Sequence, residues 1–195
     1  MKRLIREYLS FALMVLGLFA ARSSLADHYY VPSGSMEPTL MPGDRVVVDK
    51  EAYGLRIPFT LYKLGSGTAP ARGDVVVFDS PEDGTRLIKR VVAVAGDTVV
   101  VKDGHASING IALAPASDPA LEKFGERTAR LDLQFGGGPD VAPTRIPEGT
   151  LLVLGDARGN SRDGRFFGFV REDAIYAKAM RVYFRADQGF VWIAL

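Results

Sequence analysis

The sequence contains no cysteine and only two histidines among its 195 residues. The absence of cysteine excludes disulfide bonds, thiolate metal sites and cysteine nucleophiles. With only His28 and His105 available, a histidine-rich metal site is not expected, and we expect no cofactor. A net charge of +1 lacks the basic excess that nucleic-acid binding requires, so nucleic acid is not an expected partner.

Compositional bias is also absent. Apolar residues make up 47% of the chain and charged residues 24%, which is close to the globular average. This composition excludes a mostly disordered chain, a collagen-like repeat and a coiled coil. The length fits one domain, with or without a smaller appendage.

One strongly apolar segment lies at the N-terminus. The basic residues Lys2, Arg3 and Arg6 precede an uncharged run over residues 8–21. As a helix this run is about 21 Å long, which is short for a bilayer core of about 30 Å. Extension to residues 4–26 gives about 34 Å and places charged side chains near the headgroups. The basic start predicts that the N-terminus is cytoplasmic and that the rest of the chain is exported.

Two interpretations of residues 1–26 remain open. A retained membrane helix and a cleavable secretory signal both have a basic start, and the small residues Ser24 and Ala26 are typical of a cleavage site. The two interpretations differ in tethering and agree on export. Under the second interpretation, cleavage would follow Ala26.

The rest of the chain predicts a mainly β protein with an antiparallel sheet. Short β-branched runs alternate with glycine-containing turn signals, and no long amphipathic helix is evident after residue 30. The expected strands cover residues 45–48, 74–78, 87–94, 98–101, 151–154 and 181–195. Residues 112–147 differ, being rich in alanine, proline, glycine and charge. We therefore expect one β domain from residues 27–103 and 148–195, with residues 104–147 as an inserted smaller subdomain.

The segment around Ser33, Gly34 and Ser35 is the first candidate for chemistry. It lies between Pro32 and Pro38, so its backbone is sharply shaped. Such a turn can present one hydroxyl and direct backbone N–H groups to the same point, as acyl transfer requires. An ordinary surface turn has the same composition.

Lys89 is the second candidate. In a strand it shares a face with Leu87, Val91 and Ala93, which are apolar. Burial on that face would lower its pKa and allow the amine to act as a general base. The alternative is a lysine whose stem lies on apolar surface while its amine reaches water.

The third candidate is the polar loop of residues 155–165. Asp163 and Arg165 can form an ion pair that fixes the loop, and Ser161 can donate a hydrogen bond to a nearby amine or ligand. A solvated hairpin loop is the alternative. Neither His28 nor His105 has a carboxylate context, so a Ser-His-Asp mechanism is not favoured.

Together these segments are more specific than any one of them. In order and content they resemble bacterial type I signal peptidases over residues 30–178. The motifs are Ser-Gly-Ser-Met-x-Pro-Thr-Leu (33–40), Asp-Lys-x-x-Tyr-Gly-x-Arg (49–56), Arg-Gly-Asp-Val-Val-Val-Phe (72–78), Ile-Lys-Arg-Val-Val (88–92), and Val-Leu-Gly-Asp through Asn-Ser-x-Asp-x-Arg (153–165).

The resemblance implies a role for each matching residue. Ser35 corresponds to the nucleophile and Lys89 to the general base, while the Ser33 hydroxyl and the Ser35 N–H form the oxyanion hole. The residues that support this dyad are Ser161, Asp163 and Arg165. The residues near the pockets for small substrate side chains are Val31, Met36, Leu40, Leu87 and Ile88.

The implied enzyme is a serine endopeptidase of the inner membrane. It would span the membrane once, with its catalytic domain on the periplasmic side, and cleave preprotein signal peptides after small residues at −1 and −3. Its partners would be those preproteins and the lipid bilayer. Two alternatives are a dedicated Ser/Lys processing peptidase of a conjugation or secretion system and a non-catalytic exported protein that binds peptides.

Several positions depart from the pattern of the family. Ala157, Gly159 and Gly164 replace Asn, Asp and Ser in the polar loop. Leu87 stands where Tyr is frequent, and Ala95 where Pro is frequent. The dyad positions are intact, so these departures bear on the rigidity of the loop and the shape of the pockets.

Overall fold

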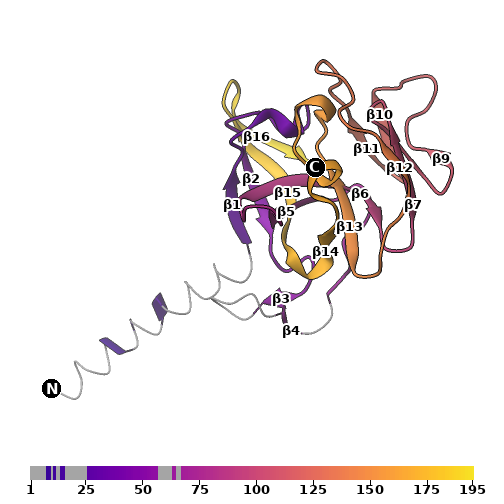
Figure 1. Ribbon diagram of the computed structural model, residues 1–195. Helices are drawn as coiled ribbons and strands as arrows, with labels where there is room; N and C mark the ends of the chain where they lie inside the picture. The colour runs from indigo at the N-terminus through magenta and orange to yellow at the C-terminus, as the bar shows by residue number, and fades with distance from the viewer. Residues whose placement is uncertain (1–7, 10, 12–13, 16–25, 57–62, 65–66) are drawn as a thin grey trace.

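The computed structural model describes residues 8–9, 11, 14–15, 26–56, 63–64 and 67–195. Figure 1 shows that strands are the main regular elements of the described residues. The N-terminal segment predicted to enter the membrane, residues 1–26, lies mostly outside the described residues. Within the described residues, no helix has the length and apolar character needed to cross a bilayer.

An eight-stranded antiparallel sheet is the largest element of the fold. Its strands follow the order β1-β2-β15-β5-β6-β13-β14, and β16 pairs with β15. The strands are β1 (Ala26–Tyr30), β2 (Arg45–Asp49), β5 (Val75–Asp79), β6 (Arg86–Val94), β13 (Thr150–Leu154), β14 (Val170–Arg171), β15 (Ile175–Arg185) and β16 (Gly189–Ala194). The prediction of a mainly β, antiparallel protein is confirmed.

A second, four-stranded sheet has the order β12-β7-β8-β9. Its strands are β7 (Thr98–Lys102), β8 (His105–Ile108), β9 (Ile111–Ala112) and β12 (Val141–Arg145). Two further pairs of strands form separate hairpins: β10 (Leu121–Phe124) with β11 (Arg127–Arg130), and β3 (Leu55–Arg56) with β4 (Lys63–Leu64). In Figure 1 the labelled strands β7 and β9–β12 lie together on the side away from β1 and β2. Because β7 joins this sheet, the sheet begins before residue 104, and the subdomain boundaries stay a prediction.

Two-residue turns fix the register of the second sheet. Asp103 and Gly104 connect β7 to β8, and Asn109 and Gly110 connect β8 to β9. All four have positive φ, between 50° and 84°. This backbone matches the twist of the flanking strands, and Asp-Gly and Asn-Gly are the pairs that adopt it most readily.

Within residues 26–56 and 67–195, the helices are all short. They are η1 (Gly34–Met36), η2 (Arg158–Asn160), α2 (Gly164–Phe167) and η3 (Glu172–Ala174). The C-terminal segment differs from its prediction as one strand over residues 181–195. It forms the end of β15, a turn and β16, because Gly189 with φ of 77° reverses the chain.

Strand β6 runs through the centre of the main sheet, between β5 and β13. Apolar side chains bury it, and the hydrophobic clusters around it include Ile88, Val91 and Val92. Charged side chains at Lys89 and Arg90 are buried in the same strand. Two consecutive basic residues of β6 are therefore buried in the interior of the fold.

Candidate active site

Ser35 lies in η1, a short turn held against the main sheet. The Val31 amide donates to the Asp44 carbonyl at 2.9 Å, and the Leu40 amide donates to the Met36 carbonyl at 2.9 Å. These bonds fix the backbone on both sides of the turn, and the Met36 side chain is fully buried beneath it. Ser35 itself is 8% exposed. The turn therefore holds one hydroxyl in a nearly closed position.

Lys89 meets this hydroxyl. Its side chain leaves β6 on a buried face, and the residue is 2% exposed. Lys89 Nζ lies 2.6 Å from Ser35 Oγ, within hydrogen-bonding distance. The amine does not extend into water, in contrast to the alternative considered from the sequence. A nucleophile and a potential base are thus in direct contact.

The surroundings of Lys89 lower the pKa of its amine, chiefly through burial. Burial lowers the pKa of Lys89 to about 8, from an ordinary value of 10.5. The carboxylates of Asp163 and Asp156 oppose this shift, and Arg165 adds to it. At pH 7 about a tenth of such amines are neutral, so the site can accept a proton from a hydroxyl near physiological pH.

Ser33 lies beside the same point. Its Oγ is 3.5 Å from Ser35 Oγ, and Ser33 is exposed while Ser35 is buried. A hydroxyl at this distance from the nucleophile can donate to an oxygen that develops charge next to Ser35. Ser33, Ser35 and Lys89, predicted separately from the sequence, are brought together at one place.

The polar loop packs directly onto the turn that bears Ser35. The Ala157 amide donates to the Ser35 carbonyl at 3.2 Å. A Cβ atom at Gly155 would lie 2.4 Å from that carbonyl oxygen and 2.2 Å from Ser161 Oγ. Glycine is therefore required at this position, because the loop approaches the turn through bare backbone.

Ser161 is buried next to this contact, and its Oγ has no hydrogen-bond partner. Among the residues that the structure describes, no hydrogen bond joins Ser161 Oγ to Lys89 Nζ. An unsatisfied buried hydroxyl is costly, and the group is free to donate if the amine or a ligand approaches. Its predicted role in orienting the lysine amine stays a prediction.

Asp163 and Arg165 form a buried ion pair with an N–O distance of 2.8 Å. Asp163 also accepts from the Gly155 amide at 2.9 Å and caps the start of α2 through the Arg165 amide. The Arg165 guanidinium reaches the carbonyls of Gly137 and Arg158. The pair thereby closes the polar loop into a fixed shape.

A second buried ion pair was not identified from the sequence. Arg90 donates to Asp156 through Nε at 2.9 Å and Nη2 at 2.7 Å, and through Nη1 to the Gly73 carbonyl at 2.8 Å. Thr39, in the segment after Ser35, also donates to Asp156. The alternation in β6 placed Arg90 on the face opposite Lys89, but nothing in the pattern identified its partner 66 residues away.

The apolar residues assigned to substrate pockets separate into two groups. Val31, Met36, Leu40 and Ile88 share one buried cluster under η1. Leu87 is partly buried and packs against a different cluster on the main sheet. Their contact with substrate stays a prediction.

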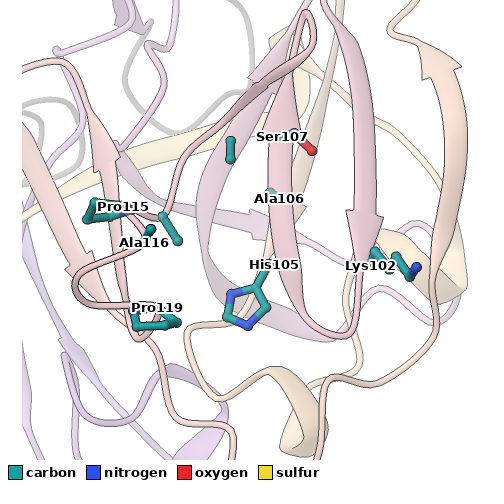
Figure 2. Close-up of a pocket in the computed structure, with 9 residues that line it drawn as sticks. Lys102, His105, Ala106, Ser107, Pro115, Ala116 and Pro119 are labelled. Atoms are coloured by element: carbon teal, nitrogen blue, oxygen red, sulfur yellow. The ribbon is translucent and has the colours of Figure 1, made fainter.

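The two histidines lie in other surroundings. His28 is exposed in β1, with Nδ1 3.7 Å from Asp27. His105 lines a cavity of about 260 Å³ with Lys102, Ser107 and several alanine and proline residues. Figure 2 shows its polar residues on the β7–β8 hairpin and the prolines opposite. This cavity shares no residue with the Ser35–Lys89 site. In the part of the chain that the structure describes, no acidic or histidine cluster has the arrangement of a metal site.

Two positions of the polar loop that depart from the family pattern, Gly159 and Gly164, have a steric explanation. A Cβ at Gly159 would lie 2.1 Å from the Phe135 carbonyl oxygen, and one at Gly164 would lie 2.7 Å from Leu152. Backbone and core occupy the space that side chains would need there. The loop of this chain is therefore fitted to its own surroundings, and glycine at these positions does not indicate looseness.

Comparisons with known proteins point to one family. A family described as "Signal peptidase, peptidase S26" matches residues 3–184. A signal peptidase I of Pseudomonas fluorescens is 34% identical over 83% of this chain, and one of Pseudomonas aeruginosa is 36% identical over the same share. A probable signal peptidase I-2 of Synechocystis is 33% identical over 81% of the chain.

These relatives are longer than the chain, which spans 66%, 66% and 63% of their respective lengths. A crystal structure of a signal peptidase I from Enterococcus faecalis is 31% identical and covers 57% of this chain and 97% of its own, with a TM-score of 0.41.

Proposed function

The chain belongs to the signal peptidase family, peptidase S26, and on this premise we propose that it is a serine endopeptidase that removes signal peptides from exported preproteins. Cleavage follows small residues at −1 and −3, and Ser35 and Lys89 form the catalytic dyad. The observation that carries the proposal is the 2.6 Å distance between Ser35 Oγ and the buried Lys89 Nζ. Few other arrangements give a serine a base without histidine.

The first step forms an acyl-enzyme. Ser35 Oγ attacks the carbonyl carbon of the scissile bond while neutral Lys89 accepts the hydroxyl proton. The tetrahedral intermediate then collapses, the C–N bond breaks, and Lys89 gives the proton to the leaving amine. A lowered pKa of about 8 suits both halves of this exchange.

The second step releases the signal peptide. Lys89, neutral again, accepts a proton from water as the water oxygen attacks the ester carbonyl. The tetrahedral intermediate then collapses, the bond between the carbonyl carbon and Ser35 Oγ breaks, and Lys89 returns the proton to Ser35 Oγ. The Ser33 hydroxyl and the Ser35 N–H donate to the oxyanion in both steps, each worth about 3 kcal/mol at comparable sites. Ser161 restricts the Lys89 amine, and Asp163 with Arg165 holds the loop that presents it.

Substrate binding uses an open strand edge. Strand β13 pairs only with residues 90–94 of β6, so the part of β6 before Arg90 has no partner on that side among the described strands. An extended peptide can add there by backbone hydrogen bonds. Val31, Met36, Leu40 and Ile88 pack in one buried cluster, and Leu87 packs against another. The proposed pockets lie beside these residues and accept only small side chains.

The placement in the cell follows from the N-terminal sequence. Residues 1–26 anchor the chain as a single span of the inner membrane, and the basic start keeps the N-terminus in the cytoplasm. The catalytic domain, residues 27–103 and 148–195, then lies on the periplasmic side with its inserted subdomain, residues 104–147. The partners are therefore exported preproteins and the bilayer that carries them.

The decisive experiment is cleavage of a preprotein by the purified chain, with Ser35→Ala as the control. We expect wild type to release a mature protein whose new N-terminus, read by mass spectrometry, follows a small residue. The Ser35→Ala variant should leave the preprotein intact. Binding without cleavage by wild type would favour the peptide-binding alternative, and cleavage of only one of several unrelated preproteins would favour a dedicated processing peptidase.

A further inference from the structure

A third buried ion pair links the β10–β11 hairpin to the loop beside Ser35. Arg158 in η2 and Glu122 in β10 are both fully buried. Arg158 Nη2 lies 2.6 Å from Glu122 Oε2, and Nη1 lies 3.1 Å from Oε1. This two-pronged arrangement fixes direction as well as distance. Neither residue has a role in the mechanism described above.

The carboxylate end of the pair is anchored in the second sheet. Glu122 Oε1 also accepts from the Ala106 amide in β8 at 2.8 Å. Arg158 Nη1 donates in addition to the carbonyl of Gly104, in the turn before β8. The carboxylate therefore joins β10 to β8, and the guanidinium is held against both.

The guanidinium end reaches the backbone that supports the nucleophile. Arg158 Nε donates to the Gly155 carbonyl at 3.0 Å. The neighbouring Ala157 amide donates to the Ser35 carbonyl at 3.2 Å. Glu122 is thus connected to Ser35 by the ion pair with Arg158, by the backbone from Arg158 to Ala157, and by the hydrogen bond from Ala157 to Ser35.

We propose that Glu122 and Arg158 are positioning residues, through which the second sheet holds Ser35 at its contact distance from Lys89. The proposal rests on the proposed function, since it assigns a consequence to that distance. Removal of one partner leaves the other buried and charged, and residues 155–158 must move to let water reach it. The Ser35 carbonyl moves with them, and the pocket around Lys89 becomes wetter.

The consequence for catalysis is specific. A displacement of about 1 Å between reacting groups lowers turnover by roughly 100-fold. None of the proposed substrate contacts is touched, so KM should change by less than about twofold. Entry of water around Lys89 reduces the effect of burial, so its titration midpoint should move to higher pH.

The test compares Glu122→Gln and Arg158→Lys with wild type and a control. The control is Asp97→Asn, which also breaks a buried carboxylate contact beside the second sheet, where Asp97 accepts from Arg72 and Asn109. Two measurements are made on the folded full chain: kcat and KM for a preprotein, and the titration of the Lys89 amine by ¹³C NMR. We expect kcat to fall and the midpoint to rise for both test variants, with neither change in Asp97→Asn.

A paired variant separates positioning from stability. Glu122→Leu with Arg158→Met replaces the ion pair by apolar side chains, which often restores stability at such sites. It still lacks the donor to the Gly155 carbonyl, so turnover should stay low even when unfolding resembles that of wild type. Recovery of turnover together with stability would overturn the proposal.

The outcomes also distinguish this proposal from the proposed function. If wild type cleaves no preprotein, the proposed function fails, and the Lys89 titration alone then tests the positioning. If wild type cleaves, and the folded Glu122→Gln and Arg158→Lys variants keep its kcat and its Lys89 midpoint, the positioning proposal is wrong.

Discussion

At the scale of single residues, the account depends on what burial does to Lys89. The apolar alternation of residues 87–93 predicts that its amine is desolvated, and the structure confirms the burial. The same alternation predicts Arg90 on the opposite face, but charges that pair across 66 residues, as Arg90 and Asp156 do, leave no local signal. Sequence patterns reveal which face a side chain takes and not which distant group it meets.

The stability of the protein should report the lowered pKa of Lys89. Between pH 8 and 10.5 the unfolded chain holds a proton on this amine that the folded chain has released, so the free energy of unfolding rises with pH in that window. Relative to a Lys89→Met variant, in which this term is absent, the gain should approach about 3 kcal/mol.

Denaturant unfolding of the two proteins at pH 7 and pH 10.5 measures this difference. Other groups titrate equally in both proteins and cancel in the comparison. A difference that stays constant across the window would show that the amine of Lys89 titrates normally in the folded protein.

At the scale of elements, the sequence predicts the strands of the β-branched runs and misses the strands of residues 112–147. Strands β2, β5, β6, β7 and β13 were expected to within one or two residues, because their β-branched runs end at glycine turns. Strands β10, β11 and β12 were missed within residues 112–147, since they are short and carry many charged or polar residues. β10 pairs locally with β11, whereas β12 pairs with the distant β7, and Glu122 meets Arg158 across 36 residues.

The contact between the polar loop and η1 should not tolerate a side chain at Gly155. Because its Cβ would overlap the Ser35 carbonyl and Ser161, Gly155→Ala should lose about 1–3 kcal/mol of stability and reduce turnover by roughly 100-fold.

Gly189→Ala is the matched control, since its Cβ would meet open space in the β15–β16 hairpin. A positive φ makes it lose stability, by about 1–2 kcal/mol, while its turnover should equal that of wild type. Equal turnover in the folded Gly155→Ala variant would show that the loop does not set the position of Ser35.

At the scale of the whole molecule, the main sheet and the second sheet both connect to the Ser35–Lys89 site. The main sheet supplies Lys89 through β6 and supports the Ser35 turn. The second sheet reaches the same turn through Glu122, Arg158 and the polar loop. The family resemblance predicted the reacting residues. It did not predict this second route, because the acidic side of the link lies in a region whose sequence resembles a loop.

The proposed anchor makes a prediction about the whole chain. If residues 1–26 form the proposed anchor, the protein in cells should sediment with membranes and resist extraction by alkaline carbonate. Protease added outside the inner membrane should digest the catalytic domain. Release of an intact chain by carbonate would contradict the anchor, and a mature form starting at Asp27 would indicate self-cleavage.

The central claim is that an unprotonated Lys89 activates Ser35. The most direct measurement is the pH dependence of kcat/KM for preprotein cleavage, together with NMR titration of the Lys89 amine in the same enzyme. Both midpoints should coincide near pH 8, with activity rising as the proton leaves, and Lys89→Met and Lys89→Arg should be inactive. Cleavage by Lys89→Met at the rate and with the pH profile of wild type would contradict the claim.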